Sequence, residues 1–206
     1  MASRFSEKQR LIGTGLLGQA VSLRLLTVDD CNQTYLDWLR DSENLSFLEI
    51  RFVPQTLQSI TEYVLSMQES TDCYLFAIIE NNSNAHIGNL RVGPINIFHG
   101  YTELSYLIGD KAFVGRGLAT ESVVLAVKFV FNVLNLRHVY AGAYGKNVAS
   151  RRVLEKAGFS QYAVVADKYV LENAYDDHIL FSLRNPNIRP LSKPSAESNL
   201  RGDSER

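Results

Sequence analysis

The sequence predicts a single domain of the α/β (α+β) class, in which a mixed and mostly antiparallel sheet carries helices on both faces. Two observations lead to this prediction. Short β-rich stretches alternate with helical periodicity, in the order strand, two helices, three strands, helix, strand, helix and two strands. The 206 residues are 46% hydrophobic and 21% charged, which is typical of a globular domain with a sizeable core.

The first half of the chain predicts a strand, two helices and a hairpin. Alternation indicates the strand, and apolar residues three or four apart indicate the helices. An Asn-rich cluster at 81–84 indicates the turn of the hairpin. In order, the predicted elements are a strand at 21–27, a helix capped by Asp29 or Asp30, a second helix capped by Thr56, and hairpin strands at 73–80 and 85–92.

The second half predicts three more sheet segments around two helices. Gly-Pro at 93–94 and His-Gly at 99–100 are breaks. The apolar run after Gly117 confines its polar residues to a narrow stripe, which predicts a helix buried on most sides. In order, the predicted elements are a strand at 101–108, a helix at about 117–134, a strand at 137–144, a helix at 148–157 ended by Gly158, and β-rich stretches at 159–170 and 177–183.

The two ends of the chain are predicted to lie outside this domain. We expect a flexible leader at 1–19, the folded domain at 20–185 and a disordered tail at 186–206, where few apolar residues could offset the entropy of ordering. The leader spells G-x-G-x-x-G at 13–18. A dinucleotide site needs a strand before this motif and a helix after it, and neither is indicated, so we interpret the match as coincidental.

Composition excludes several classes of function. A net charge of -1 gives no general attraction to nucleic acid or to an anionic membrane, and no apolar run approaches the roughly 20 residues of a spanning helix. The N-terminus lacks the apolar core of a secretory signal, which predicts a cytoplasmic protein. Two distant cysteines and four unclustered histidines predict neither a disulfide framework nor a metal site.

A glycine cluster after the strand at 101–108 has the right context for binding an anion. Gly115 and Gly117 lack the Cβ atoms that would keep a bulky anion away, and the unpaired amides at the start of the following helix can face a pyrophosphate. The cluster lacks the Lys-Ser/Thr ending of a nucleoside triphosphate loop, which favours coenzyme binding over phosphoryl transfer. A purely structural glycine-rich helix entry is the alternative.

The stretch 101–159 resembles the acyl-coenzyme A binding half of GNAT acetyltransferases. Residues 112–117 (AFVGRG) are similar to the family's Q/R-x-x-G-x-G/A loop, although Ala112 departs from its usual Gln or Arg. Residues 147–159 (NVASRRVLEKAGF) are similar to the N-x-x-S/A-(x)7-G-F helix, most closely in the RimJ/RimL-like branch. The resemblance implies a sheet that is splayed at its centre, acetyl-CoA as acyl donor and a primary amine as acceptor.

The resemblance also assigns roles to residues. Asn147 would bind the pantetheine arm, and Ser150 would lie near the coenzyme sulfur. Glu103 matches the position of a general base, and the resemblance places the oxyanion amide near Leu107 or Ile108. A small packing residue is the alternative for Ser150, and a solvated edge carboxylate for Glu103. The implied coenzyme-binding residues are Leu107, Ile108, Val114, Gly115, Arg116, Gly117, Leu118, Ala119, Asn147 and Ser150.

The acceptor is less well defined by the sequence. The segment around Trp38, with Glu49 and Arg51 after it, resembles GNAT enzymes of amino-sugar and surface-polysaccharide pathways, so we take these three residues as substrate-binding candidates. Three hypotheses stay open: a small-molecule or amino-sugar acetyltransferase, a protein N-terminal acetyltransferase, and a catalytically silent coenzyme sensor. A homodimer is also left open.

Overall fold

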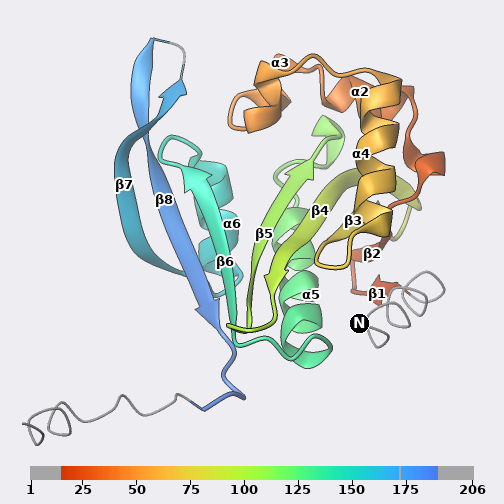
Figure 1. Cartoon of the computed structure of the whole chain (residues 1–206). Coiled ribbons are helices and arrows are strands. Elements are labelled where there is room, and N and C mark those ends of the chain that lie inside the picture. The colour runs from red at the N-terminus through yellow and green to blue at the C-terminus, as the bar shows by residue number, and fades with distance from the viewer. Residues whose placement is uncertain (1–14, 172, 190–206) are drawn as a thin grey trace, which may run out of the picture.

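The computed structural model describes residues 15–171 and 173–189, and its strands form one eight-stranded sheet (Figure 1). The strand order is β1-β2-β3-β4-β5-β6-β8-β7. Neighbouring strands are antiparallel except β5 and β6, which are parallel. The predicted mixed and mostly antiparallel sheet is therefore confirmed. The strands are β1 Leu16–Leu17, β2 Val21–Leu25, β3 Tyr74–Glu80, β4 Ala85–Asn96, β5 Tyr101–Ile108, β6 His138–Tyr144, β7 Ser160–Leu171 and β8 Ala174–Arg184.

Helices cover both faces of the sheet, as predicted (Figure 1). On one face lie the two helices of the second half, α5 and α6. On the other face lie α2 and α4, with shorter turns between them. The helical elements are η1 Val28–Asp30, α2 Gln33–Trp38, α3 Ser42–Leu45, η2 Glu49–Phe52, α4 Leu57–Glu69, η3 Lys111–Phe113, α5 Leu118–Asn132 and α6 Val148–Lys156.

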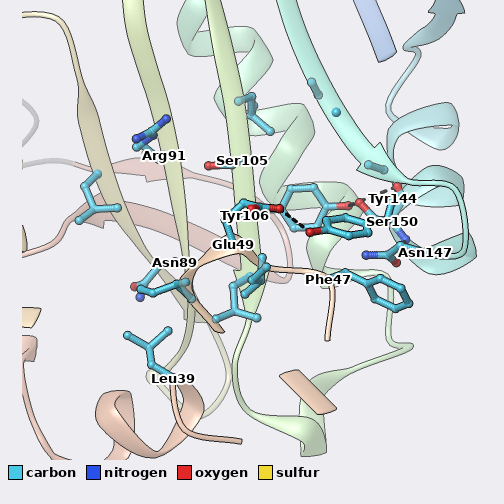
Figure 2. A pocket seen from close by; sticks show the side chains of 18 of the residues that line it. Leu39, Phe47, Glu49, Asn89, Arg91, Ser105, Tyr106, Tyr144, Asn147 and Ser150 are labelled. Carbon is cyan, nitrogen blue, oxygen red and sulfur yellow. Dashed lines mark hydrogen bonds between the residues drawn. The ribbon is translucent and has the colours of Figure 1, made fainter. Parts of the chain in front are cut away.

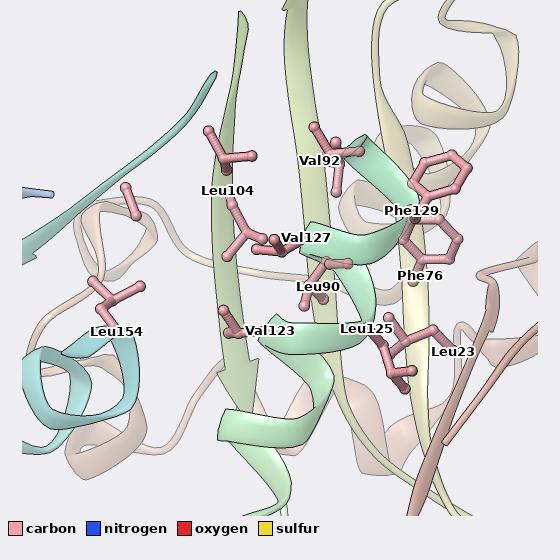
Figure 3. Close-up of a cluster of buried hydrophobic side chains, with 14 of the residues drawn as sticks. Leu23, Phe76, Leu90, Val92, Leu104, Val123, Leu125, Val127, Phe129 and Leu154 are labelled. Carbon is pink, nitrogen blue, oxygen red and sulfur yellow. The ribbon is translucent and has the colours of Figure 1, made fainter. Parts of the chain in front are cut away.

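The main core lies between α5 and the sheet (Figure 3). Phe129 is 1% exposed, and its ring meets the face of Phe76 edge-on, with the ring centroids 5.7 Å apart. Because α5 buries residues around most of its circumference, it acts as a rigid support behind the central strands. The opposite face has its own apolar cluster, which includes Trp38 of α2 and Val64 of α4.

The sheet opens at its centre, between β5 and β6. Their parallel ladder covers only Tyr101–Glu103 against His138–Tyr140. β6 nevertheless continues to pair with β8 as far as Tyr144, and β5 continues to pair with β4 as far as Ile108. Beyond Glu103 the two strands therefore diverge, which leaves a gap lined by backbone groups (Figure 1). The predicted central splay is confirmed.

Several local predictions were wrong. The cap of α2 is Asn32, whose side chain accepts from Tyr35 N at 3.1 Å, because Asp30 is held instead by Arg24 in a two-pronged pair of 2.6 and 2.7 Å. The break expected at 93–94 is a register shift within β4, which continues to Asn96. Sequence reasoning also missed α3 and η2, whose short turns carry no clear periodicity.

The domain ends also differ in detail from the prediction. Leu16 and Leu17 fall within the expected leader, yet they form β1 against β2. At the other end, Asn185, the last residue of the predicted domain, is 1% exposed and donates to Leu136 O at 2.9 Å, and turn residues 186–187 follow it within the expected tail. Residues 1–14 and 190–206 lie outside the described part of the chain. They include most of the predicted leader, with the first two residues of the G-x-G-x-x-G match, and most of the predicted tail.

Candidate active site

A cavity of about 680 Å³ opens into the gap between β5 and β6 (Figure 2). Its wall combines β4 and β5 on one side with the end of β6 and the start of α6 on the other. The turn η2 and the helices α2 and α4 complete it. The splayed sheet thus places side chains from opposite halves of the chain around one space.

The glycine cluster forms an open amide cradle at the start of α5. Gly115 has a φ of 79° and Gly117 a φ of 81°, and a Cβ built on either residue would meet nothing within 4 Å. The first backbone bond of the helix is donated by Glu121 N to Gly117 O at 3.2 Å. Within the described part of the chain, no group accepts from the amides of residues 115–120, so they can bind an anion.

The other residues predicted around this cradle contribute in different ways. Val114 is 57% exposed, and the guanidinium of Arg116 lies over the Phe113 ring at 5.1 Å. The Leu118 side chain belongs to the core, so only its amide can face a ligand. Ala119 is half-buried in the first turn of the helix. The cradle is therefore built mainly from the main chain, and Ala112 in place of a longer side chain leaves it intact.

The start of α6 brings Asn147 and Ser150 to the cavity, as predicted. Asn147 Oδ1 caps the helix by accepting from Ser150 N at 3.0 Å, which fixes the Asn147 side chain. Ser150 Oγ lies 3.0 Å from the hydroxyl oxygen of Tyr106, which also donates to Ser150 O at 3.3 Å (Figure 2). Burial raises the pKa of the Tyr106 phenol to about 12. Leu154, one turn later, is fully packed in the core.

Sequence reasoning missed Tyr106, although a signal was available. Tyr106 alternates along β5 with Leu104 and Thr102, and these side chains point to the face that carries α5 and α6. Its position opposite Ser150 depends on the splay, because a regular β5–β6 ladder would close that space. Tyr106 can therefore be recognised as a site residue only when the glycine cluster and the Asn147 helix are placed in one fold.

The main-chain amides of Leu107 and Ile108, the two candidates for stabilising an oxyanion, point in opposite directions from β5. Gly109 N donates to Ile87 O at 2.9 Å, so the amides of odd-numbered residues in this antiparallel pair point toward β4. The Leu107 amide consequently belongs to the sheet, although its side chain lines the cavity. The amides of Tyr106 and Ile108 point the other way, into the gap. Of the two predicted residues, Ile108 has the suitable orientation.

A second polar group lies on the acceptor side of the cavity, where Glu49 Oε1 accepts a short hydrogen bond from the Tyr144 hydroxyl. Burial, followed by this bond to the carboxylate, raises the pKa of Tyr144 to about 12. The Tyr144 ring stacks on Tyr169 with centroids 3.8 Å apart, and Phe47 lies 5.7 Å away. Glu49 itself is solvent-exposed, so its carboxylate is accessible to a cation. The Tyr144 ring is 4% exposed, and the Arg51 guanidinium lies 5.2 Å from its centroid.

The other two substrate-binding candidates do not line the cavity. Trp38 is 6% exposed and packs so closely on Gly109 that a Cβ there would come within 2.2 Å of the indole. Arg51 instead fixes η2, because it donates to Ser46 O at 2.9 Å and to Val170 O at 3.0 Å. Trp38 and Arg51 thus support neighbouring segments, and of the three candidates Glu49 alone lines the cavity.

Glu103 shares a strand face with Ser105 and Leu107, as predicted from the alternation of β5. Ser105 and Leu107 line the cavity, whereas Glu103 lies outside it, at the end where β5 pairs with β6. The Glu103 side chain is exposed rather than buried, which differs from the environment expected of a desolvated base. Any contact between Glu103 and an acceptor at the cavity therefore requires a bridging group such as water.

Residues 15–171 and 173–189 contain neither a metal-ligand cluster nor a membrane-spanning helix. No group of three or more His, Cys, Asp or Glu residues is arranged to hold a metal ion. Over the same residues, no helix has both the length and the apolar character needed to cross a bilayer.

A splayed mixed sheet, an amide cradle after its fifth strand and an Asn-capped helix beside the gap match the arrangement that the sequence resemblance implies for an acyl-coenzyme A dependent N-acyltransferase. Comparison with known proteins identifies the family. The acetyltransferase (GNAT) domain family matches residues 21–160, and the chain belongs to this family. It is a GNAT acetyltransferase, and acetyl-CoA is the family's acyl donor.

Two relatives illustrate the range of the family. Over 182 residues the chain is 30% identical to the Probable N-acetyltransferase YjcK of Bacillus subtilis (strain 168), which covers 83% of this chain and 97% of that protein. It is 26% identical to the ribosomal protein uS5-alanine N-acetyltransferase of Escherichia coli (strain K12) over 87 residues, 42% of this chain and 44% of that protein.

Solved structures confirm the fold. The spermidine N-acetyltransferase of Vibrio cholerae, in complex with CoA and spermine, matches with a TM-score of 0.73 at 18% identity and covers 82% of this chain and 97% of that one. The ribosomal-protein-S5-alanine acetyltransferase of Vibrio fischeri matches with a TM-score of 0.71 at 20% identity, over 86% of this chain and all of that one. At these identities the likeness concerns the fold alone.

Proposed function

We propose that the protein transfers acetyl from acetyl-CoA to a primary amine of a small molecule, such as an amino sugar, by direct attack in a ternary complex. The observation that carries this proposal is the cavity itself. Ser150 and Asn147 line it on the side of the coenzyme motifs, and Glu49 lines it on the side of the N-terminal helices. Donor and acceptor groups can therefore meet in the gap between β5 and β6.

The residues on the coenzyme side fit acetyl-CoA. The amides of residues 115–119 would hold the pyrophosphate, and the side-chain amide of Asn147, whose Oδ1 is used by the helix cap, retains an NH₂ group for the pantetheine arm. Bound acetyl-CoA supplies an electrophilic thioester. The Ile108 amide, which points into the gap, would hydrogen-bond the oxygen that gains negative charge during attack.

The acceptor side fits an amine that arrives as a cation. The Glu49 carboxylate would hold the ammonium group, with the half-buried Phe47 ring in the same cavity wall. An amine with a pKa of about 10.4 needs roughly 4 to 5 kcal/mol to lose its proton at neutral pH, so a base must assist. We propose that Glu103 takes this proton through water, since its face of β5 leads along Ser105 into the cavity.

Ser150 and Tyr106 would stabilise the departing thiolate. A thiol has a reference pKa of about 8.5, so full proton transfer from a phenol with a pKa of about 12 would be uphill by about 5 kcal/mol. Tyr106 therefore serves as a hydrogen-bond donor that orients the Ser150 hydroxyl. In this proposal the proton itself reaches the sulfur from solvent or from the reacting amine.

A peptide N-terminus is the second candidate acceptor. It is favoured by the relatives that are named as acting on ribosomal proteins, one of which shares 87 aligned residues with this chain. A peptide α-amine has a pKa of about 7.7 to 8.0, so it would depend far less on a base than a lysine-like amine. The dependence of activity on Glu103 is thus expected to differ between the two acceptor classes.

The test is to incubate the purified protein with acetyl-CoA and separate panels of amino sugars, simple amines and peptides, and to measure free thiol. At least one small amine should give acetylated product, confirmed by mass spectrometry. Product from peptides alone would favour the N-terminal acetyltransferase. Tight coenzyme binding without product from any panel would favour the silent sensor.

A further inference from the structure

The cavity contains one charged group that the acetyl transfer described above does not use. Glu49 and Arg91 are the two charged residues among the described side chains that line it. Arg91 comes from β4, on one side of β5, whereas Glu49 and its partner Tyr144 lie toward β6, on the other side (Figure 2). The cavity is therefore polarised, with a carboxylate at one side and a guanidinium at the other.

Arg91 lacks the partners that a structural arginine normally has. Its Nε is buried and makes no hydrogen bond, and the three ion pairs among the described residues involve only Arg24 with Asp30 and Lys111 with two carboxylates. Glu103 lies on the same face of the sheet, two residues from Ser105, which is the register partner of Arg91, yet it forms no pair with the guanidinium. An unpaired, half-buried cation is costly, and a bound anion would remove that cost.

The cavity-lining neighbours of Arg91 add neutral hydrogen-bonding groups. Asn89, two residues earlier on β4, and Ser105, opposite on β5, line the cavity beside it (Figure 2). A planar guanidinium with five donors is suited to bind a carboxylate or a phosphate through two bonds at once. The site thus has the composition of an anion subsite in the wall of the acceptor cavity.

We infer that the acceptor carries an anionic group, a carboxylate or a phosphate, which binds Arg91 while its amine lies near Glu49. This inference rests on the proposed acetyl transfer to a small amine and narrows its acceptor class. Neutral or purely cationic amines lack a group for Arg91, so they leave its charge unpaired. The acceptor is accordingly an amine with both charges, such as an amino acid or a phosphorylated amino sugar.

The experiment compares matched acceptors that differ in one anionic group. Glucosamine is paired with glucosamine 6-phosphate, and β-alaninamide with β-alanine, so that the pairs separate phosphate from carboxylate. Binding of each compound to the coenzyme A-loaded protein is measured by calorimetry, and thiol release from acetyl-CoA is measured in parallel. In at least one pair, the member with the anionic group should bind at least about tenfold more tightly than the member without it.

Arg91→Gln should remove this preference by weakening binding of the member with the anionic group, with coenzyme affinity and binding of the acceptors that lack this group nearly unchanged. Arg91→Lys should retain part of it, because the charge stays and the two-pronged geometry is lost. Lys128→Gln, which removes an exposed positive charge from α5, should have no effect. Thermal melting of each variant checks the fold.

Equal binding of both members in both pairs by the native protein would overturn the inference, as would an unchanged preference in Arg91→Gln. Failure of the proposed function looks different. In that case no acceptor releases thiol, and the calorimetric preference still decides whether Arg91 binds an anion.

Discussion

The two sides of the cavity are built in different ways. On the coenzyme side, consecutive residues of two short motifs supply main-chain amides and one helix cap, at 115–119 and 147–150. On the acceptor side, single side chains converge from η2, β4, β6 and β7. Main-chain geometry follows from local sequence, whereas convergent side chains depend on the whole fold. A family can thus keep the binding site of its shared acyl donor while the residues that bind the acceptor vary independently.

The largest expected effect would test the main-chain origin of coenzyme binding. Gly117→Val places a branched side chain where the cradle is open, at a φ of 81°, and should reduce coenzyme affinity about a hundredfold or more. Gly100→Val is the matched control, because Gly100 also has a positive φ, of 66°, and has room for a Cβ in the β4–β5 turn. Calorimetry with coenzyme A measures the affinity, and thermal melting measures the backbone strain that both variants share.

If both glycine variants lose affinity equally, backbone strain rather than the cradle explains the loss. If Gly117→Val binds coenzyme normally while remaining folded, the pyrophosphate site lies elsewhere. Either result would contradict the contrast between a coenzyme site built from the main chain and an acceptor site built from side chains.

The same contrast explains what could be predicted from the sequence. The cradle, the Asn147 cap and α5 follow from local signals: glycine spacing, a capping residue and helical periodicity. For Tyr106 the sequence signal is limited to its alternation along β5, and Arg91 carries no such signal, because each becomes a site residue only through residues on distant strands. Trp38 was misassigned for a related reason, since a large aromatic residue near a motif looks the same in sequence whether it lines a site or fills a core.

The second prediction concerns the acceptor side. Glu49→Gln removes the carboxylate but keeps the side chain's size, and should lower kcat/KM for a cationic acceptor by about tenfold to a hundredfold, mainly through KM. Coenzyme affinity should not change. Glu155→Gln, on the exposed face of α6, is the charge-matched control. An equal loss of kcat at unchanged KM would instead indicate that Glu49 acts in the chemical step.

A smaller effect on kcat is expected from Tyr106, which lies between the coenzyme side and the acceptor side of the cavity. Tyr106→Phe removes the hydroxyl that contacts Ser150 Oγ, and should lower kcat about threefold to tenfold, the range of one neutral hydrogen bond. Because the pKa of the Tyr106 phenol is raised to about 12, this hydroxyl keeps its proton across neutral pH, and the loss should be the same from pH 6 to 9. Steady-state kinetics over that range would measure it. A loss that grows as the pH rises would contradict the assignment of Tyr106 as a neutral donor.

The smallest effect is expected for Glu103→Gln, since the exposed Glu103 would act only through water. The variant should lower kcat several-fold at pH 7 and less at pH 9, because a larger share of a lysine-like amine is already neutral at the higher pH. Pairing it with Glu49→Gln in the same pH series separates the two carboxylates, since loss of ammonium binding should appear in KM at both pH values. If Glu103→Gln has no effect at pH 7, no base role remains for it. A loss of equal size at both pH values would make Glu103 a positioning residue, with the amine losing its proton by another route.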